Sequence, residues 1–205
     1  MRSVPVRVTE VVEETPTQCT LVLDWEPEFT PGQFLMVWVP GVDEVPMGLS
    51  ARSPAAITVQ RMGEATRALC SLSPGDRVGV RGPLGRGFRP GGGEDALLVG
   101  GGNGTAPLVP LAQELVSNGC RVTIAVGART TGELLFVDRL EAISGRPVLV
   151  ATDDGTAGHH GLVTELAERA LDGEGSDRVY TCGPEVMMRK VAEACWGRGV
   201  PFQAS

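Results

Sequence analysis

The chain up to about residue 92 alternates between apolar and polar side chains with the two-residue period of β-strands. Turn-forming sequences rich in Pro, Gly and Asp separate the apolar segments, and a short helix is expected over 65–72. Several short strands at this spacing predict an antiparallel sandwich or a small barrel. The expected strands cover 7–14, 19–25, 34–40, 55–62 and 76–82.

From residue 95 the period changes, because continuous apolar runs now alternate with amphipathic stretches. Strands followed by helices predict βαβ units and a parallel sheet. Thr105 is expected to cap the first of these helices and Gly119 to end it. The expected strands cover 96–101, 121–128, 147–154, 178–184 and 200–205, and the expected helices cover 106–119, 132–143, 161–171 and 185–199.

The two patterns meet in RPGGGED, residues 89–95, which has the composition of a flexible, polar linker. A chain of 205 residues is long enough for two compact domains. The predicted organisation is therefore a β domain over 1–92 followed by an α/β domain over 93–205.

Glycine and proline are over-represented, with 28 and 15 copies, about a fifth of the chain against a usual share of about 12%. Hydrophobic residues make up 42%, which is too many for a disordered chain. The excess of glycine therefore predicts tight turns, or backbone that closely approaches a ligand.

The charge balance argues against nucleic acid as a partner, since 18 Lys and Arg against 25 Asp and Glu give a net charge of −7. No apolar run approaches the roughly 18 residues that a membrane span requires. The first residues also lack the apolar core of a signal peptide. We therefore expect a cytoplasmic protein that has no membrane partner.

The five cysteines are widely scattered, and no two have the spacing of a metal knuckle. They suggest neither a metal site nor a disulfide framework, so a reducing compartment is expected. His159 and His160 are adjacent and point apart on a strand or helix, so no metal site is predicted there either. The cysteines are Cys19, Cys70, Cys120, Cys182 and Cys195.

The strongest single motif is GGGNGTAP, residues 100–107, which follows an expected strand and opens an expected helix. Glycines in this position allow a sharp turn and let backbone N–H groups approach a pyrophosphate. The motif differs from the usual dinucleotide fingerprint because Pro107 lies in the first helical turn. A glycine-rich turn that binds nothing is the alternative.

Three further segments lie at the ends of three other expected strands of this half. Cys182-Gly183-Pro184 should face the same crevice as the glycine loop, because ligands bind outside the carboxyl ends of parallel strands. Asp153-Asp154-Gly155 and Arg129 end two more strands, the latter where adenosine ribose is usually recognised. The alternatives are a buried apolar cysteine, a solvated turn and a surface cation.

No Ser/His/Asp set or carboxylate pair is recognisable, so the reaction chemistry is expected to belong to a cofactor. In the β half, the strand-like stretch 46–50 and the turn 63–66 are the two places that could hold one. In the second, N–H groups and the Thr66 hydroxyl could bind a diphosphate. An ordinary strand and turn are the alternatives.

In this order, these features resemble the ferredoxin–NADP reductase superfamily, in which a flavin-binding β-barrel precedes a nicotinamide-nucleotide-binding α/β domain. The motifs that carry the resemblance lie at 31–34, 75–85, 100–107 and 182–184, with Met187. Within the superfamily, the stretches 31–50, 81–88 and 200–205 are most similar to the electron-transfer subunit of the dihydroorotate dehydrogenase B type.

The resemblance implies that FAD binds residues 1–92 and that NAD binds residues 93–205. The family subunit also holds a [2Fe-2S] cluster and passes electrons from the FMN of a catalytic dihydroorotate dehydrogenase subunit to NAD. The implied FAD contacts are Pro46, Met47, Gly48, Leu49, Ser50, Val59, Gly63, Ala65 and Thr66. The implied NAD contacts are Gly101, Gly102, Asn103, Gly104, Thr105, Arg129, Asp154, Gly183 and Pro184. Cys182 is the candidate catalytic residue.

The chain departs from the family pattern in two ways. Val45 and Gly48 replace the Arg and Ser of the superfamily flavin motif, which affects hydrogen bonding at the reactive edge of the flavin. The cluster cysteines of the family follow the stretch that matches 200–205, so this chain is expected to lack the cluster. It would then be either a piece of a longer subunit or a shortened reductase that delivers electrons directly from FAD.

Two other functions fit the same motifs. One is a stand-alone NAD(P)H:acceptor oxidoreductase of the superfamily, or a subunit of another complex. The other is a non-catalytic regulatory module that keeps the fold, which the residues at 45 and 48 favour. Arg129 could contact a 2′-phosphate, but no basic cluster accompanies it, and the resemblance to the family implies NAD over NADP.

Overall fold

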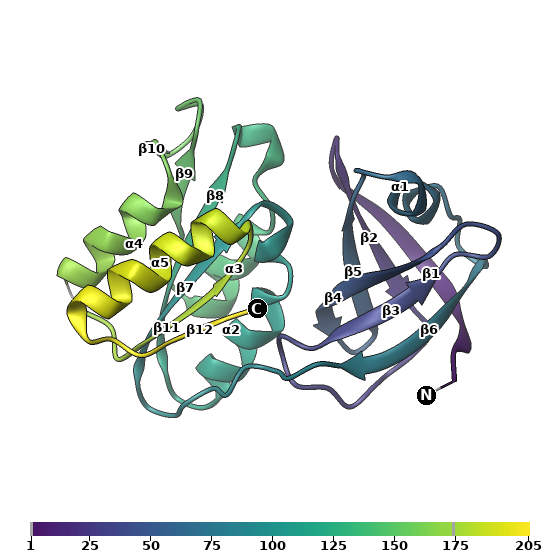
Figure 1. Cartoon of the computed structure of the whole chain (residues 1–205), viewed down its shortest axis with the longest axis horizontal. Helices are drawn as coiled ribbons and strands as arrows, with labels where there is room; N and C mark the ends of the chain where they lie inside the picture. Colours follow the sequence, from purple (N-terminus) through teal and green to yellow (C-terminus); the bar gives the residue numbers. More distant parts are fainter. Residues whose placement is uncertain (1, 174) are drawn as a thin grey trace. The chain divides into compact units, whose positions relative to one another are not determined.

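The computed structural model describes residues 2–173 and 175–205, which form two compact units, Met1–Gly87 and Phe88–Ser205 (Figure 1). Each unit has its own hydrophobic core.

The first unit is a closed antiparallel barrel with the strand order β1-β2-β5-β4-β3-β6 (Figure 1). The barrel closes because β1 pairs with β2 along one edge and with β6 along the other. This confirms the predicted antiparallel barrel. Its elements are β1 (Val4–Thr15), β2 (Gln18–Leu23), β3 (Phe34–Trp38), β4 (Glu44–Arg52), β5 (Ala55–Gln60), α1 (Glu64–Cys70) and β6 (Arg77–Leu84).

The interior of the barrel is mainly aliphatic, and Leu21, Leu35 and Ile57 are fully buried. One polar chain crosses three neighbouring strands on the outer face of the wall, because Thr20 and Thr58 alternate with the core residues Leu21 and Ile57. The Thr20 and Thr58 hydroxyl oxygens lie 2.9 Å apart, and the Thr58 hydroxyl donates to Ser50 Oγ at 2.9 Å. These buried hydroxyls are tolerated because they hydrogen-bond to one another.

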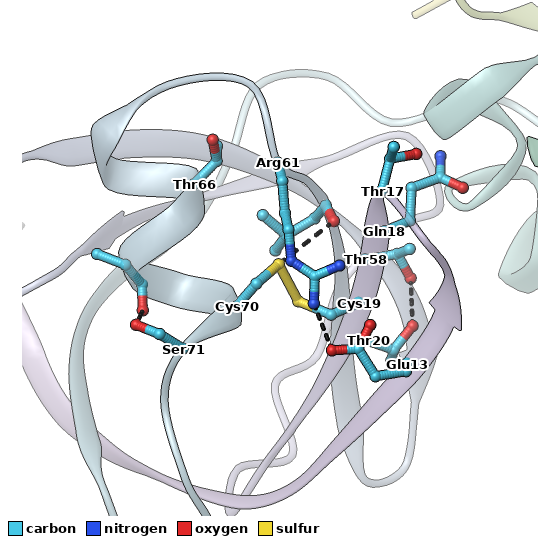
Figure 2. The surroundings of a disulfide bond; sticks show 12 residues. Glu13, Thr17, Gln18, Cys19, Thr20, Thr58, Arg61, Thr66, Cys70 and Ser71 are labelled. Carbon is cyan, nitrogen blue, oxygen red and sulfur yellow. Dashed lines mark hydrogen bonds and ion pairs between the residues drawn. A yellow bond between two sulfur atoms is a disulfide. The ribbon is translucent and has the colours of Figure 1, made fainter.

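A disulfide between Cys19 and Cys70 links strand β2 to helix α1 (Figure 2). The expectation of no disulfide was wrong. The two residues are 51 positions apart in the sequence, but their Cα atoms are 5.8 Å apart because α1 packs against β2 and β5. Cys120, Cys182 and Cys195 are free and buried.

The second unit is a parallel sheet with the strand order β10-β9-β8-β7-β11-β12, which confirms the predicted α/β fold. Helices α2 and α3 cover one face, and α4 and α5 cover the other (Figure 1). Its elements are β7 (Asp95–Gly101), η1 (Gly102–Thr105), α2 (Leu108–Ser117), β8 (Arg121–Ala128), η2 (Thr131–Glu133), α3 (Val137–Ser144), β9 (Leu149–Thr152), β10 (His159–His160), α4 (Val163–Asp172), β11 (Arg178–Cys182), α5 (Glu185–Arg198) and β12 (Phe202–Ala204).

Two local expectations for this unit are confirmed and one was wrong. Gly119, with φ +77°, follows the end of α2, and the predicted last strand is present as β12. Thr105 does not cap α2, because the chain first makes a short 3-10 turn over Gly102–Thr105. Helix α2 then begins at Leu108 with Pro107 at the N-cap position.

The glycine-rich segment 89–95 is attached to the second unit by hydrogen bonds. The Tyr180 hydroxyl donates to the Arg89 carbonyl oxygen at 3.2 Å and accepts from the Gly91 N–H at 3.3 Å. The Gln203 side chain bonds both the N–H and the carbonyl of Arg89. The segment expected to be flexible is therefore held in place against β11 and β12.

No helix in the described ranges is long and apolar enough to cross a membrane.

Candidate functional site

The glycine loop after β7 packs directly on the end of β11. Gly100 and Cys182 are paired in the parallel register of the two strands. A Cβ atom on Gly104 would lie 2.5 Å from the Cys182 carbonyl oxygen and from the Gly183 backbone. Only glycine allows this approach. The structure therefore brings the loop and the Cys-Gly-Pro segment together at the carboxyl edge of the sheet.

Gly102 leaves open space at the turn itself. Its φ is +52°, and nothing lies within 4 Å of the position where a Cβ would be. A ligand can therefore approach the backbone here, which is the cradle that a pyrophosphate requires.

Thr105 supplies a buried hydroxyl at the same turn. Its side chain is 0% exposed, and among the described residues its Oγ1 has no hydrogen-bond partner. An unpartnered buried hydroxyl is uncommon in a folded protein. The turn therefore contains one polar atom, Thr105 Oγ1, to which none of the described protein groups is hydrogen-bonded.

Cys182 is a neutral thiol in this setting. It is 9% exposed, and burial raises the pKa of its thiol to about 11. At neutral pH the sulfur therefore carries its proton and is a weak nucleophile. It can provide a small polarisable surface beside the loop, together with Gly183 and Pro184.

The ends of β8 and β9 form a second polar cluster on the same edge of the sheet. The Arg129 guanidinium donates to both Glu133 carboxylate oxygens, at 2.9 and 2.7 Å. Asp154 accepts from the Thr156 hydroxyl and N–H, and these bonds lower the pKa of Asp154. The Thr131 N–H donates to the Thr156 hydroxyl and so links the two loops.

In the barrel, the stretch 46–50 shows the alternation of a strand with one face inside. Met47 and Leu49 belong to the barrel core, whereas Pro46 is exposed and Gly48 is partly exposed. Ser50 is fully buried and bonded to Thr58. Within the stretch 46–50, therefore, only Pro46 and Gly48 are accessible to a ligand outside the barrel.

The turn before α1 is stabilised by hydrogen bonds to the side chain of Thr66. The Thr66 hydroxyl accepts from the N–H groups of Met62 and Gly63, at 3.0 and 2.9 Å, and donates to the Gly63 carbonyl. The hydroxyl that was expected to bind a diphosphate thus holds the turn together. The remaining N–H groups of the first helical turn have no intrahelical acceptor. Ala65 is buried there, and Val59 lies in the barrel core.

Sequence reasoning missed two relationships near these segments, the Cys19–Cys70 bond and the Glu133–Arg129 pair. The second carries a recognisable signal, because a carboxylate four positions from an arginine is a common local ion pair. The first has no local signal.

The glycine loop fits a dinucleotide by its open cradle and its unused hydroxyl. A [2Fe-2S] cluster does not fit the described residues in the same way. Within 2–173 and 175–205, no three His, Cys, Asp or Glu side chains gather into a possible metal site.

Comparison with known proteins places these features in a family. Residues 98–193 match the model of the oxidoreductase NAD-binding domain. The chain is 44% identical over 199 residues to a Methanocaldococcus jannaschii protein named as a probable dihydroorotate dehydrogenase B (NAD(+)), electron transfer subunit. It is 46% identical over 202 residues to the protein of that name from Methanocella arvoryzae. These alignments cover 97% and 98% of the chain and 76% of each relative.

Solved structures agree with this similarity. An NADH-dependent reduced ferredoxin-NADP oxidoreductase structure matches with a TM-score of 0.86 and 30% identity, over 98% of this chain and 75% of the other. The FAD/NAD-binding domain of a Vibrio cholerae nitric oxide dioxygenase matches with a TM-score of 0.83 and 24% identity, over 100% and 99%. The second match shows the fold alone.

Proposed function

Because the chain belongs to the family of dihydroorotate dehydrogenase B electron transfer subunits, we propose that it passes electrons between a partner dehydrogenase and NAD through a bound FAD. The observation that best supports this function is the open glycine cradle packed on Cys182 and Gly183. It occurs in a chain that shares the family's sequence over almost its whole length.

We place NAD on residues 93–205. The N–H groups of the glycine loop would bind its diphosphate, with the Thr105 hydroxyl as a further donor. Cys182, Gly183 and Pro184 would lie against the nicotinamide, and the neutral thiol adds no charge there. The cluster of Arg129 and Asp154 at the ends of β8 and β9 would face the adenosine ribose.

We place FAD on residues 1–92. Pro46 and Gly48 would present the outer face of β4 to the isoalloxazine, while Met47 and Leu49 support that strand from the barrel interior. Ser50 would fix the strand through its bond with Thr58. Gly63, Ala65 and Thr66 would hold the diphosphate through backbone N–H groups, and Val59 lies behind them in the core. The Thr66 hydroxyl shapes this turn instead of contacting the ligand.

The chain contributes to the reaction by binding the FAD and NAD cofactors, orienting them and shielding them from solvent. FAD, when bound, supplies the group that exchanges electrons with the nicotinamide. The carbanion-forming base for dihydroorotate oxidation would belong to an FMN-containing partner subunit, in the cytoplasm. We assign no step to a [2Fe-2S] cluster, because the described residues offer no ligand set for it.

A flavin reductase of another complex is the second candidate, and the 30% identity to the NADH-dependent oxidoreductase structure favours it. Both candidates predict a yellow protein whose flavin absorbance is bleached by NADH without oxygen. The two candidates differ in the partner protein with which the flavin exchanges electrons. Electron transfer from dihydroorotate to NAD, measured after adding the catalytic subunit, would support the first candidate.

The proposal has a clear failing outcome. If the purified chain carries no flavin and takes up none when FAD is added, the electron-transfer function is wrong. If it binds FAD but neither NADH nor NADPH bleaches the flavin, the chain is a regulatory module and not a reductase.

A further inference from the structure

The Cys19–Cys70 disulfide joins the wall of the barrel to helix α1 (Figure 2). Cys19 lies in strand β2, Cys70 is the last residue of α1, and both are buried. The chain between them contains β3, β4, β5 and α1. Every residue that we propose to contact FAD therefore lies within the loop that this bond closes.

Helix α1 depends on tertiary contacts for its position. It has only seven residues, and isolated helices of that length are unstable in water. Before the helix, the Arg61 guanidinium donates to the Pro16 carbonyl oxygen at 3.1 Å. It also pairs with Glu13 (Figure 2). At the other end Leu69 is fully buried, and the disulfide is the covalent attachment.

We propose that the Cys19–Cys70 bond is a covalent clamp that holds α1 on the β2–β5 wall and thereby keeps FAD bound. This inference rests on the flavin function proposed above. A dithiol can open the clamp by donating two electrons: the S–S bond breaks, each cysteine sulfur gains a proton, and the dithiol becomes a cyclic disulfide.

The reduced state can keep the barrel intact. The Cys70 sulfur lies 3.7 Å from the Val59 carbonyl oxygen, so a thiol at this position has an acceptor within reach. Cys19 lies opposite Val59 in the β2–β5 register and stays inside the barrel wall. Opening the clamp therefore removes a restraint on α1 and leaves the strand pairing in place.

The first test counts thiols in the untreated protein. Alkylation in denaturant followed by mass spectrometry should label three cysteines, namely Cys120, Cys182 and Cys195, and all five after reduction. Labelling of all five before reduction would overturn the proposal.

The second test measures flavin affinity in Cys19→Ser, Cys70→Ser and the double variant, with Cys120→Ser as the matched control. The apparent Kd for FAD should rise about tenfold in each single variant, which corresponds to α1 being in place in about one molecule in ten. The double variant should be no weaker than either single variant, because the bond is already lost. Wild-type affinity in the single variants, or effects that multiply in the double variant, would contradict the clamp.

The third test separates the clamp from the flavin function. Reducing the wild-type protein should speed amide hydrogen exchange in residues 63–72 and leave exchange in the paired barrel strands unchanged. This readout needs no flavin, so a protein that binds no FAD still tests the clamp. A protein that binds FAD but shows no change in exchange or affinity on reduction overturns the clamp alone.

Discussion

Gly104 lies in direct contact with the backbone of Cys182, since a Cβ atom at Gly104 would be 2.5 Å from the Cys182 carbonyl oxygen. This contact joins the loop after β7 to the end of β11. The nucleotide cradle is thus held by backbone packing between two strands that are far apart in the sequence.

Replacing Gly104 with alanine should displace the loop from Cys182. A displacement of about 1 Å in a positioning element can cost about a hundredfold in rate, so we expect kcat/KM for NADH to fall by about that factor. FAD should stay bound, because we place it on the barrel. Stopped-flow flavin reduction and the visible spectrum measure the two effects.

Gly119→Ala is the matched control, since Gly119 follows α2 outside the loop, nothing lies within 4 Å of a Cβ there and the cost is that of a positive φ, about 1 kcal/mol. We expect kcat/KM for NADH to fall less in this variant than in Gly104→Ala. Loss of FAD together with NADH oxidation in Gly104→Ala would mean that the loop is misassigned.

Glu133 should influence the choice between NADH and NADPH. It holds Arg129 through two hydrogen bonds, and Asp153 adds further negative charge near this guanidinium. Glu133→Gln weakens the pairing and frees Arg129 for a 2′-phosphate. Exposed ion pairs are weak, so kcat/KM for NADPH should rise only about two- to fivefold.

The control for this variant is Glu10→Gln, which removes one exposed negative charge from the barrel. An equal rise in both variants would assign the effect to net charge. An unchanged ratio of NADPH to NADH rates in Glu133→Gln would remove Glu133 from the specificity site.

Thr58 should be important for the stability of the barrel. Its hydroxyl links Thr20 to Ser50 in a fully buried chain of hydrogen bonds. Thr58→Val keeps the shape but leaves two buried hydroxyls with one partner fewer, at a cost of about 1–3 kcal/mol. Urea unfolding measures this cost, and the exposed Thr9→Val is the control; equal midpoints for the two variants would refute the assignment.

The Cys182 thiol should make the second unit less stable at high pH. Its pKa is raised from 9.0 to about 11 in the folded state, so the unfolded chain loses this proton first as the pH rises. Stability should therefore decline between pH 9 and 11. Urea midpoints at pH 8 and 10.5 should differ less in Cys182→Ala than in the wild type, and an equal difference in both would contradict the raised pKa.

The two folds and the position of the glycine loop can be predicted from the sequence. Both follow from local patterns: the change from a two-residue to a helical period near residue 95, and glycines placed between an apolar run and an amphipathic stretch. Such patterns depend on neighbours in the chain, so they can be recognised without knowing which strands pair. The position of Gly119 after α2 is of the same kind.

The contacts between distant side chains, in contrast, follow from the three-dimensional arrangement of the strands and helices. The Cys19–Cys70 bond joins residues 51 positions apart because barrel closure places α1 beside β2. The alternation along β4 was visible in the sequence, but the choice of its inner face follows from the strands on either side. Contacts between distant segments depend on which strands become neighbours in the sheet, and the local period of a strand is the same whichever neighbour it has.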